Sequence, residues 1–306
     1  MIPFLAKRIL AGAVVLFAIA VLVFGAARWS KGGPFDEERE LPKDVRVALE
    51  ARWHLHDSVP RQFGYFLSGL AKGDLGPSMR SLDWTVNEIV GAAFPVSAAL
   101  AALALAWAVP CGLWLGARAA MRPGGAADAG AAAASLAGVA LPSFVIAPLL
   151  VMVFAFLLGV LPPGGWGSLR QVILPAIALG LPVCAVVARL ARAATRENLA
   201  KDYCRTARAK GLDERSVAMH HALRNGLLPV LNYLGPATAA ALTGSFAVEK
   251  VFAIPGLGSH FVNAAMGRDF TLLVGVVLVY SALLVAVNIG VDVACAAIDP
   301  RLRESE

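Results

Sequence analysis

Charged residues are scarce in this chain of 306 residues, since Asp, Glu, Lys and Arg make up only 16% of it. A soluble domain carries about 25%. Hydrophobic residues reach 58%, which excludes a disordered protein and argues against an ordinary cytosolic enzyme. The four cysteines form no CxxC pair, so neither a disulfide scaffold nor a zinc site is expected. Aromatic residues are only 8% of the chain, and no Arg-aromatic run suggests nucleic-acid binding.

Motifs of the common hydrolases and nucleotide-binding proteins are missing too: the chain has no HExxH, Walker A or GxSxG sequence. Ser245 in an apolar stretch and His260 beyond it leave an intramembrane serine hydrolase as a remote alternative. Small residues in such stretches more often pack helices together. We therefore expect no catalytic residue, no bound cofactor and no metal ligand in this chain.

Long apolar stretches are what the chain has in abundance. A membrane-spanning helix needs about 20 mostly apolar residues, and six stretches qualify: 9–27, 94–117, 129–160, 172–188, 227–248 and 270–298. The first is longer than the apolar core of a signal peptide, about 7–15 residues, so we interpret it as an uncleaved anchor. The sequence thus predicts an all-α integral membrane protein with six transmembrane helices.

The distribution of Lys and Arg predicts the orientation of these helices. Of the 27 Lys and Arg, 15 fall in segments that are cytoplasmic if the N-terminus is cytoplasmic, and three fall in the short loops of the other side. The remaining nine lie in the long segment after the first helix, and long segments cross largely regardless of charge. Both termini are therefore expected in the cytoplasm.

Three regions follow from this pattern: an N-terminal transmembrane helix at 1–27, an extracytoplasmic segment at 28–91 and a core of five helices at 92–306. In the extracytoplasmic segment we expect a helix from Leu41 through Trp53, ended by Pro60, and a second amphipathic piece over 63–70. The segment is too short for a catalytic domain of its own. A cap on the membrane domain or a contact with a partner is expected instead.

A basic cytoplasmic stretch over 189–226 carries helical periodicity, with Gly211 interrupting it. One interpretation is a loop that only fixes topology. Its length favours another, in which a short helix docks into a groove on a soluble partner. Asp292 is the one ionisable residue predicted well inside a span, and Asn288 lies one turn away. We expect a structural hydrogen-bonded role for it, so energy for transport would come from another chain.

Specific motifs run in order along the whole chain. The basic stretch contains RTARAKGL at 205–212 and HALRN at 221–225. Three motifs follow the basic stretch: VEKVF at 248–252, IPGLG at 254–258 and DPR at 299–301. Four motifs precede the basic stretch: GGPF at 32–35, GDLGPS at 73–78, FPVSA at 94–98 and LPSFV at 141–145. This set resembles the permeases of ABC importers in the peptide/nickel family, and the upstream motifs resemble its oligopeptide B-type branch. The Glu of the family's EAA signature is replaced by Arg205-Thr206-Ala207.

The resemblance implies a type I importer permease in a bacterial inner membrane, with the extracytoplasmic segment inserted after the first helix. It implies as partners a homologous second permease, two ABC ATPases that hold ATP and Mg, and an extracytoplasmic peptide-binding protein. The basic loop, 189–228, would contain the coupling helix that seats in an ATPase cleft. The coupling residues are then Arg205, Thr206, Ala207, Arg208, Ala209, Lys210, Gly211 and Leu212.

The resemblance also implies peptide as the substrate, and oligopeptides in particular. Polar residues inside the predicted spans are the candidates for lining the path: Ser143, Asn232, Thr238, Thr243, Ser245 and Asn288. Hydrogen bonding between helices is the alternative role for each of them. Because dipeptide, nickel and glutathione permeases share the inner loop, they remain alternative functions. A self-sufficient channel or carrier is a further alternative of another class.

Overall fold

The structure is a computed structural model that describes residues 2–29, 53–54, 56–81, 83–121, 124–125, 130, 138 and 141–298. Helices make up most of this part, joined by loops, and an isolated antiparallel bridge pairs Pro77 with Thr85. Its long helices are α1 (Ile2–Trp29), α4 (Val86–Met121), α7 (Leu169–Leu199), α11 (Leu228–Val251) and α13 (Phe270–Ile298). The chain is therefore all-helical over the residues described, as the sequence predicts.

Five of the six predicted apolar stretches lie within described helices. Four helices, α1, α4, α7 and α13, are long and apolar enough to cross a membrane, and α11 covers the stretch predicted at 227–248. The stretch predicted at 129–160 falls largely outside the described residues as far as position 140. Its remainder forms α6 (Ser143–Leu150), which continues into a π-helical turn, η1 (Val151–Leu157).

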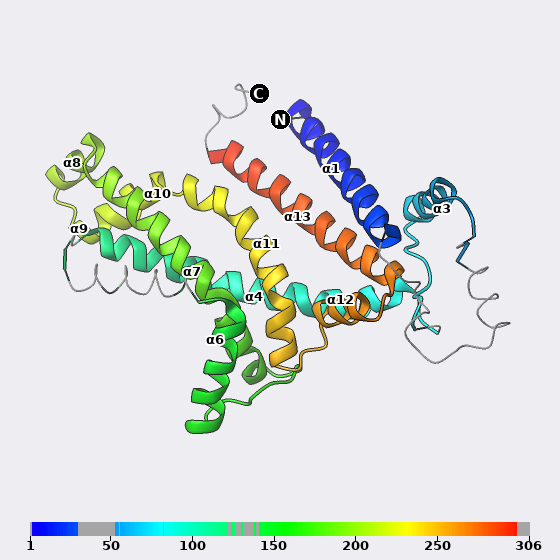
Figure 1. Ribbon diagram of the computed structural model, residues 1–306. Coiled ribbons are helices and arrows are strands. Elements are labelled where there is room, and N and C mark those ends of the chain that lie inside the picture. Colours follow the sequence, from blue (N-terminus) through cyan, green and yellow to red (C-terminus); the bar gives the residue numbers. More distant parts are fainter. Residues whose placement is uncertain are drawn as a thin grey trace.

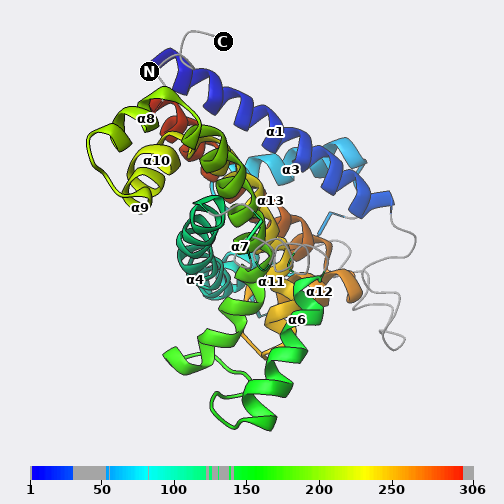
Figure 2. The ribbon, with the colours of Figure 1, turned by 90° about the vertical axis from the view of Figure 1, so that its left-hand side faces the viewer.

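Helices α4 and α7 pack against each other over much of their lengths (Figures 1 and 2). Glycines permit this approach: a Cβ on Gly112 would lie 2.8 Å from the carbonyl oxygen of Cys184, and one on Gly116 would lie 2.3 Å from that of Ala188. The indole nitrogen of Trp107 on α4 donates a 2.9 Å hydrogen bond to the carbonyl of Ala176 on α7. Small residues four apart are a common way for membrane helices to approach closely.

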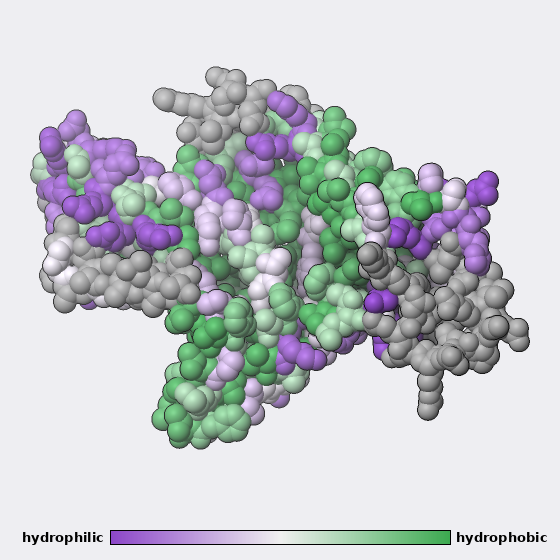
Figure 3. All heavy atoms as spheres, viewed as in Figure 1, coloured by the Kyte–Doolittle hydropathy of each residue, from purple (hydrophilic) through white to green (hydrophobic). Residues whose placement is uncertain are grey.

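Helix α1 lies at the edge of the molecule and runs beside α13 (Figures 1 and 2). Arg8 near its start pairs with Asp292 near the end of α13, at 3.1 Å. This ion pair gives Asp292 a partner on another helix, as its predicted structural role requires. The outward face of α1 exposes large apolar side chains, namely Ile9, Leu10, Val14, Phe17 and Leu22, and Figure 3 shows this region as hydrophobic. We conclude that lipid tails cover this face.

The segment that the sequence predicts to be extracytoplasmic contains α3 (Val59–Ala71), which includes the predicted amphipathic piece over 63–70. Pro60 lies in the first turn of α3, where proline suits a helix start, and the expectation that it ends a preceding helix stays a prediction. The helix expected from Leu41 lies outside the described residues through position 52. Phe63 and Phe66 pack on Phe24 of α1 with ring centroids 5.2 and 5.6 Å apart.

The loop after α3 is held against the start of α13 by Asp269. This buried carboxylate accepts hydrogen bonds from the Ser78 hydroxyl and from the backbone N–H groups of Met79 (3.1 Å), Arg80 (3.2 Å) and Leu272 (3.0 Å). The bond to Leu272 caps the first turn of α13. Asp269 therefore attaches the loop after α3 to the start of α13.

Candidate functional site

The basic stretch folds into a compact helical unit at one end of the molecule (Figure 1). It contains α8 (Asp202–Ala209), α9 (Glu214–Ser216), a π-helical turn η2 (Val217–Ala222) and α10 (Leu223–Asn225). Hydrophilic side chains gather over this end in Figure 3. The first part of the stretch belongs to α7, which continues to Leu199, past its predicted end at residue 188.

Gly211 ends α8 in the left-handed conformation, with φ at +86°. Its N–H donates to the carbonyl of Arg208 at 2.9 Å, and the N–H of Leu212 reaches the carbonyl of Ala207 at 3.3 Å. Glycine is favoured at such a helix end because a Cβ would add strain. The interruption seen in the sequence is therefore the C-terminal cap of α8.

Ala207 faces the interior of its own loop. It packs with the buried residues Cys204, Val217 and Ala222, and Leu199 covers this small core. Ala207 and Gly211 are four residues apart, but they do not form one open face for a partner, because Ala207 is buried within the chain while Gly211 is exposed. The small size of Ala207 lets α8 pack on η2.

Arg208 links α8 to α9 and to the end of α7. Its Nε and Nη2 lie 2.6 and 3.2 Å from the two carboxylate oxygens of Glu214, and its Nη1 donates to the carbonyl of Leu199 at 3.1 Å. These hydrogen bonds lower the pKa of Glu214 below its ordinary value. Glu214 of the same chain therefore already occupies the guanidinium of Arg208.

The other predicted coupling residues are on the surface of this unit. They are Arg205, Thr206, Ala209, Lys210, Gly211 and Leu212. Leu212 exposes 42% of its surface and Tyr203 exposes 36%. Arg205 contacts only the exposed Asp202, at 3.3 Å, among the described residues. The surface of α8 and of the turn that follows it, residues 202–212, thus combines exposed cations with two exposed apolar side chains. The Arg208–Glu214 pair and the Gly211 cap hold this surface in place.

The six candidate path residues do not form one cluster in the part of the chain described. The hydroxyls of Thr238, Thr243 and Ser245 donate to carbonyls three or four residues earlier in α11. Asn232 accepts a 3.1 Å contact from the thiol of Cys295 on α13. Ser245 is buried and bonds to its own helix, so the structure does not pair it with His260 as a hydrolase would require.

The remaining two candidates lie close to glycines of α11. A Cβ on Gly235 would meet the Oδ1 of Asn288 at 2.0 Å, and one on Gly244 would meet the Oγ of Ser143 at 3.3 Å. Asn288 comes from α13 and Ser143 from α6. These residues therefore lie where neighbouring helices approach α11.

Glu249 is a functional candidate that the sequence did not reveal. Its carboxylate is fully buried, accepts a 2.7 Å bond from the Ser97 hydroxyl and a 2.9 Å bond from the N–H of Gly258, and lies against Gly256. Ser97 in turn accepts from the N–H of Leu257 at 2.8 Å. Glu249 thereby joins α4, α11 and the short helix α12 (Leu257–Met266). The signal available was the VEKVF–IPGLG motif, which places Glu249 beside two glycines.

Helices α4, α7 and α13 pack on α11 and, like α1, are long and apolar enough to cross a membrane, which defines an integral membrane protein with a basic helical unit at one end. Residues 108–304 match the model of the binding-protein-dependent transport system inner membrane component family. The chain belongs to this family and is a multi-pass protein of the bacterial inner membrane.

Several relatives match the chain over nearly its whole length, and they are permeases of peptide transport systems. It is 43% identical over 305 residues to the oligopeptide transport system permease protein OppB of Salmonella typhimurium, covering 99% of this chain and 100% of that protein. It is 40% identical over 305 residues to OppB of Haemophilus influenzae, with the same coverage. It is 39% identical over 303 residues to the dipeptide transport system permease protein DppB of Bacillus subtilis, covering 99% and 98%. The expected family is thereby confirmed.

Proposed function

We propose that this chain is a permease subunit of an ATP-driven importer that takes up oligopeptides. The surface of α8 carries the proposal, because a capped helix clasped to its neighbours can transmit force from a soluble subunit into α7 and α11. The chain crosses the membrane six times with both termini in the cytoplasm, which places α8 on the side where ATP is available. It belongs to the type I importer permeases.

The energy and the reaction belong to other chains in this proposal. A homologous second permease completes the pathway, two ABC ATPases bind ATP and Mg, and an extracytoplasmic binding protein delivers the peptide. ATP-driven closure of the ATPases moves α8 as a rigid body and shifts the helices between inward-facing and outward-facing states. This chain is the non-catalytic subunit, and the polar residues on α6, α11 and α13 line part of the path.

Negative charge placed on the exposed surface of α8 and of the turn that follows it tests the coupling. Arg205→Glu and Leu212→Asp leave the clasp and the small core of the loop intact, so the complex still assembles. In proteoliposomes that contain the complete complex, we expect peptide uptake to fall by about tenfold or more, as for the loss of a central interface residue. ATP hydrolysis then no longer responds to the peptide-loaded binding protein.

Lys72→Glu is the matched control, because Lys72 is an exposed cation at the end of α3, on the opposite side of the membrane. It should leave uptake and ATP hydrolysis unchanged. Normal, binding-protein-stimulated uptake by both α8 variants would contradict the coupling role. Flux through liposomes that contain this chain alone would instead support a self-sufficient channel.

A dipeptide permease is the second candidate, favoured by the 39% identity to DppB of Bacillus subtilis. Competition decides between the two. If oligopeptides are the substrate, unlabelled tetrapeptides and pentapeptides compete with a labelled tripeptide for uptake, whereas dipeptides compete weakly. The reverse order of competition would establish the dipeptide function. Uptake of nickel or glutathione in the same assay would point to the other branches of the family.

A further inference from the structure

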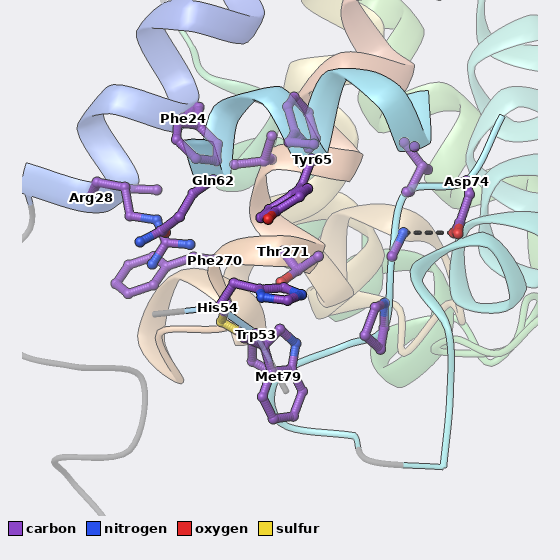
Figure 4. A pocket seen from close by; sticks show the side chains of 17 residues that line it. Phe24, Arg28, Trp53, His54, Gln62, Tyr65, Asp74, Met79, Phe270 and Thr271 are labelled. Atoms are coloured by element: carbon purple, nitrogen blue, oxygen red, sulfur yellow. Dashed lines mark hydrogen bonds between the residues drawn. The ribbon is translucent and has the colours of Figure 1, made fainter. Parts of the chain in front are cut away.

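A cavity of about 220 Å³ lies at the outer end of α1, between α1, α3 and the start of α13. Figure 4 shows the side chains that line it. Phe24, Tyr65 and Phe270 supply aromatic walls, and Thr271, Tyr65 and His54 supply groups that can hydrogen-bond. This cavity is separate from the α8 surface and from the polar residues of α11.

Arg28 brings a positive charge to the wall of this cavity. Its guanidinium lies over the Phe24 ring, 5.4 Å from the centroid, and the side chain is half-buried. No carboxylate of a described residue forms an ion pair with it. Asp74 lies at the opposite end of the cavity in Figure 4, where its Oδ1 accepts the N–H of Gly76 at 2.9 Å. A partly desolvated guanidinium that pairs with no carboxylate of the described residues favours an anionic ligand.

The depth of the cavity indicates where that anion comes from. The next residue, Trp29, is 91% exposed, and the preceding turns of α1 expose Val21 and Leu22. An exposed tryptophan directly after an apolar lipid-facing helix marks the level of the lipid headgroups. Arg28 is therefore at the depth of the phosphates of the outer leaflet.

An apolar groove runs along the other side of the same helix end. It shares Ala27 and Phe270 with the cavity, and its other lining residues are Leu22, Val23, Ala26, Ala265, Arg268 and Leu273, of which Arg268 alone is charged. The groove offers an acyl chain a place directly beside the cavity that would take the headgroup. A free phosphate ion or a soluble peptide would leave this groove unused.

We infer that the cavity binds the headgroup of an anionic phospholipid, with its phosphate against Arg28. Phosphatidylglycerol fits it, because the hydroxyls of Tyr65 and Thr271 can bond to a glycerol headgroup. One acyl chain lies in the groove beside Ala27. The bound lipid bridges α1, α3 and α13, and so secures a peripheral helix that otherwise packs on the membrane core mainly through α13.

Native mass spectrometry of the purified complex, titrated with phosphatidylglycerol or phosphatidylcholine, tests this inference. We expect phosphatidylglycerol to bind more tightly, and Arg28→Gln to weaken its binding by about tenfold, as for the loss of one charge-assisted contact. Arg28→Lys keeps the charge and should retain most of the binding. Arg61→Gln is the matched control, because Arg61 is an exposed cation on α3 that does not line the cavity.

Three results would overturn the inference. One is equal binding of phosphatidylglycerol by the wild type and the Arg28→Gln variant. Another is displacement of the lipid by inorganic phosphate, which would show a simple anion site. The third is displacement by a tripeptide, which would show a peptide site. If Arg28→Gln disturbs folding, the test uses the unfolding temperature of the wild-type protein. Phosphatidylglycerol should raise this temperature more than phosphatidylcholine does, and an equal effect of the two lipids would contradict the inference.

Discussion

At the scale of single residues, Glu249 is the side chain whose removal should lower the stability of the fold most. Its carboxylate accepts hydrogen bonds from Ser97 and from the backbone of Gly258 inside the helix packing. Glu249→Ala leaves these buried donors without an acceptor, at about 1–3 kcal/mol for each unsatisfied group. We expect a clear fall in the thermal unfolding midpoint of the detergent-solubilised protein.

Two further variants show whether the hydrogen bonds of Glu249, and not any substitution at this end of α11, set the unfolding midpoint. Lys250→Ala removes an exposed neighbour and should leave the midpoint unchanged. Glu249→Gln keeps one acceptor oxygen for Gly258 and should lie between Glu249→Ala and the wild type. An unchanged midpoint in Glu249→Ala would mean that the carboxylate does not hold α12 in place.

Glu249 also shows where sequence reasoning fails at this scale. The apolar stretch is predicted to end at Val248, so the sequence pattern places Glu249 just beyond the span. It is buried because α12 folds back and places the N–H of Gly258, nine residues on, against the carboxylate. The burial of Ala207 likewise depends on η2 packing against α8. Such returns of the chain leave no signal in local periodicity.

At the scale of elements, the Arg208–Glu214 clasp should hold α8 against α9. Glu214→Gln removes the charge that Arg208 contacts, and pairs with exposed partners contribute about 0.2–1 kcal/mol. Hydrogen exchange in peptides that cover 202–216 should accelerate by about two- to fivefold at pH 7. Glu197→Gln is the control, because it breaks the exposed pair with Lys201 (3.2 Å) outside the clasp.

The pH dependence of this clasp has a definite sign. Because Arg208 lowers the pKa of folded Glu214, the stabilisation is fully present above the unfolded value of about 4.3. It is lost as the pH falls through the lower folded pKa. The ratio of exchange in Glu214→Gln to that in the wild type should therefore approach one below that pKa. A ratio independent of pH would contradict an ionic clasp.

Helix positions were predictable at this scale, whereas helix ends were not. Apolar stretches located α1, α7, α11 and α13 because burial in lipid or protein demands continuous apolar residues. Helix α7 continues to Leu199 because polar residues such as Arg196 lie on its exposed side, which a count of apolar residues cannot register. Helix α4 begins at Val86, directly after Thr85, whose N–H and hydroxyl both donate to Glu88 at 2.8 Å.

At the scale of the whole molecule, the topology that we propose, with six crossings, puts the start of α1, the end of α13 and α8 on one side of the membrane. The Arg8–Asp292 pair brings the first two together. α3 and the Asp269-bound loop gather at the opposite ends of α1 and α13 (Figure 1). The proposed topology agrees with the charge asymmetry of the sequence, because cytoplasmic loops of membrane proteins generally carry an excess of Lys and Arg.

Single cysteines can test this topology directly. In a chain with Cys111, Cys184, Cys204 and Cys295 replaced by serine, Lys72→Cys and Arg215→Cys each place a thiol at an exposed position on one side. A membrane-impermeant maleimide should label residue 72 in spheroplasts, and residue 215 only in inside-out vesicles. Detergent should make both react, which controls for accessibility. Labelling of residue 215 in spheroplasts would place α8 outside, and no cytoplasmic ATPase could then reach it.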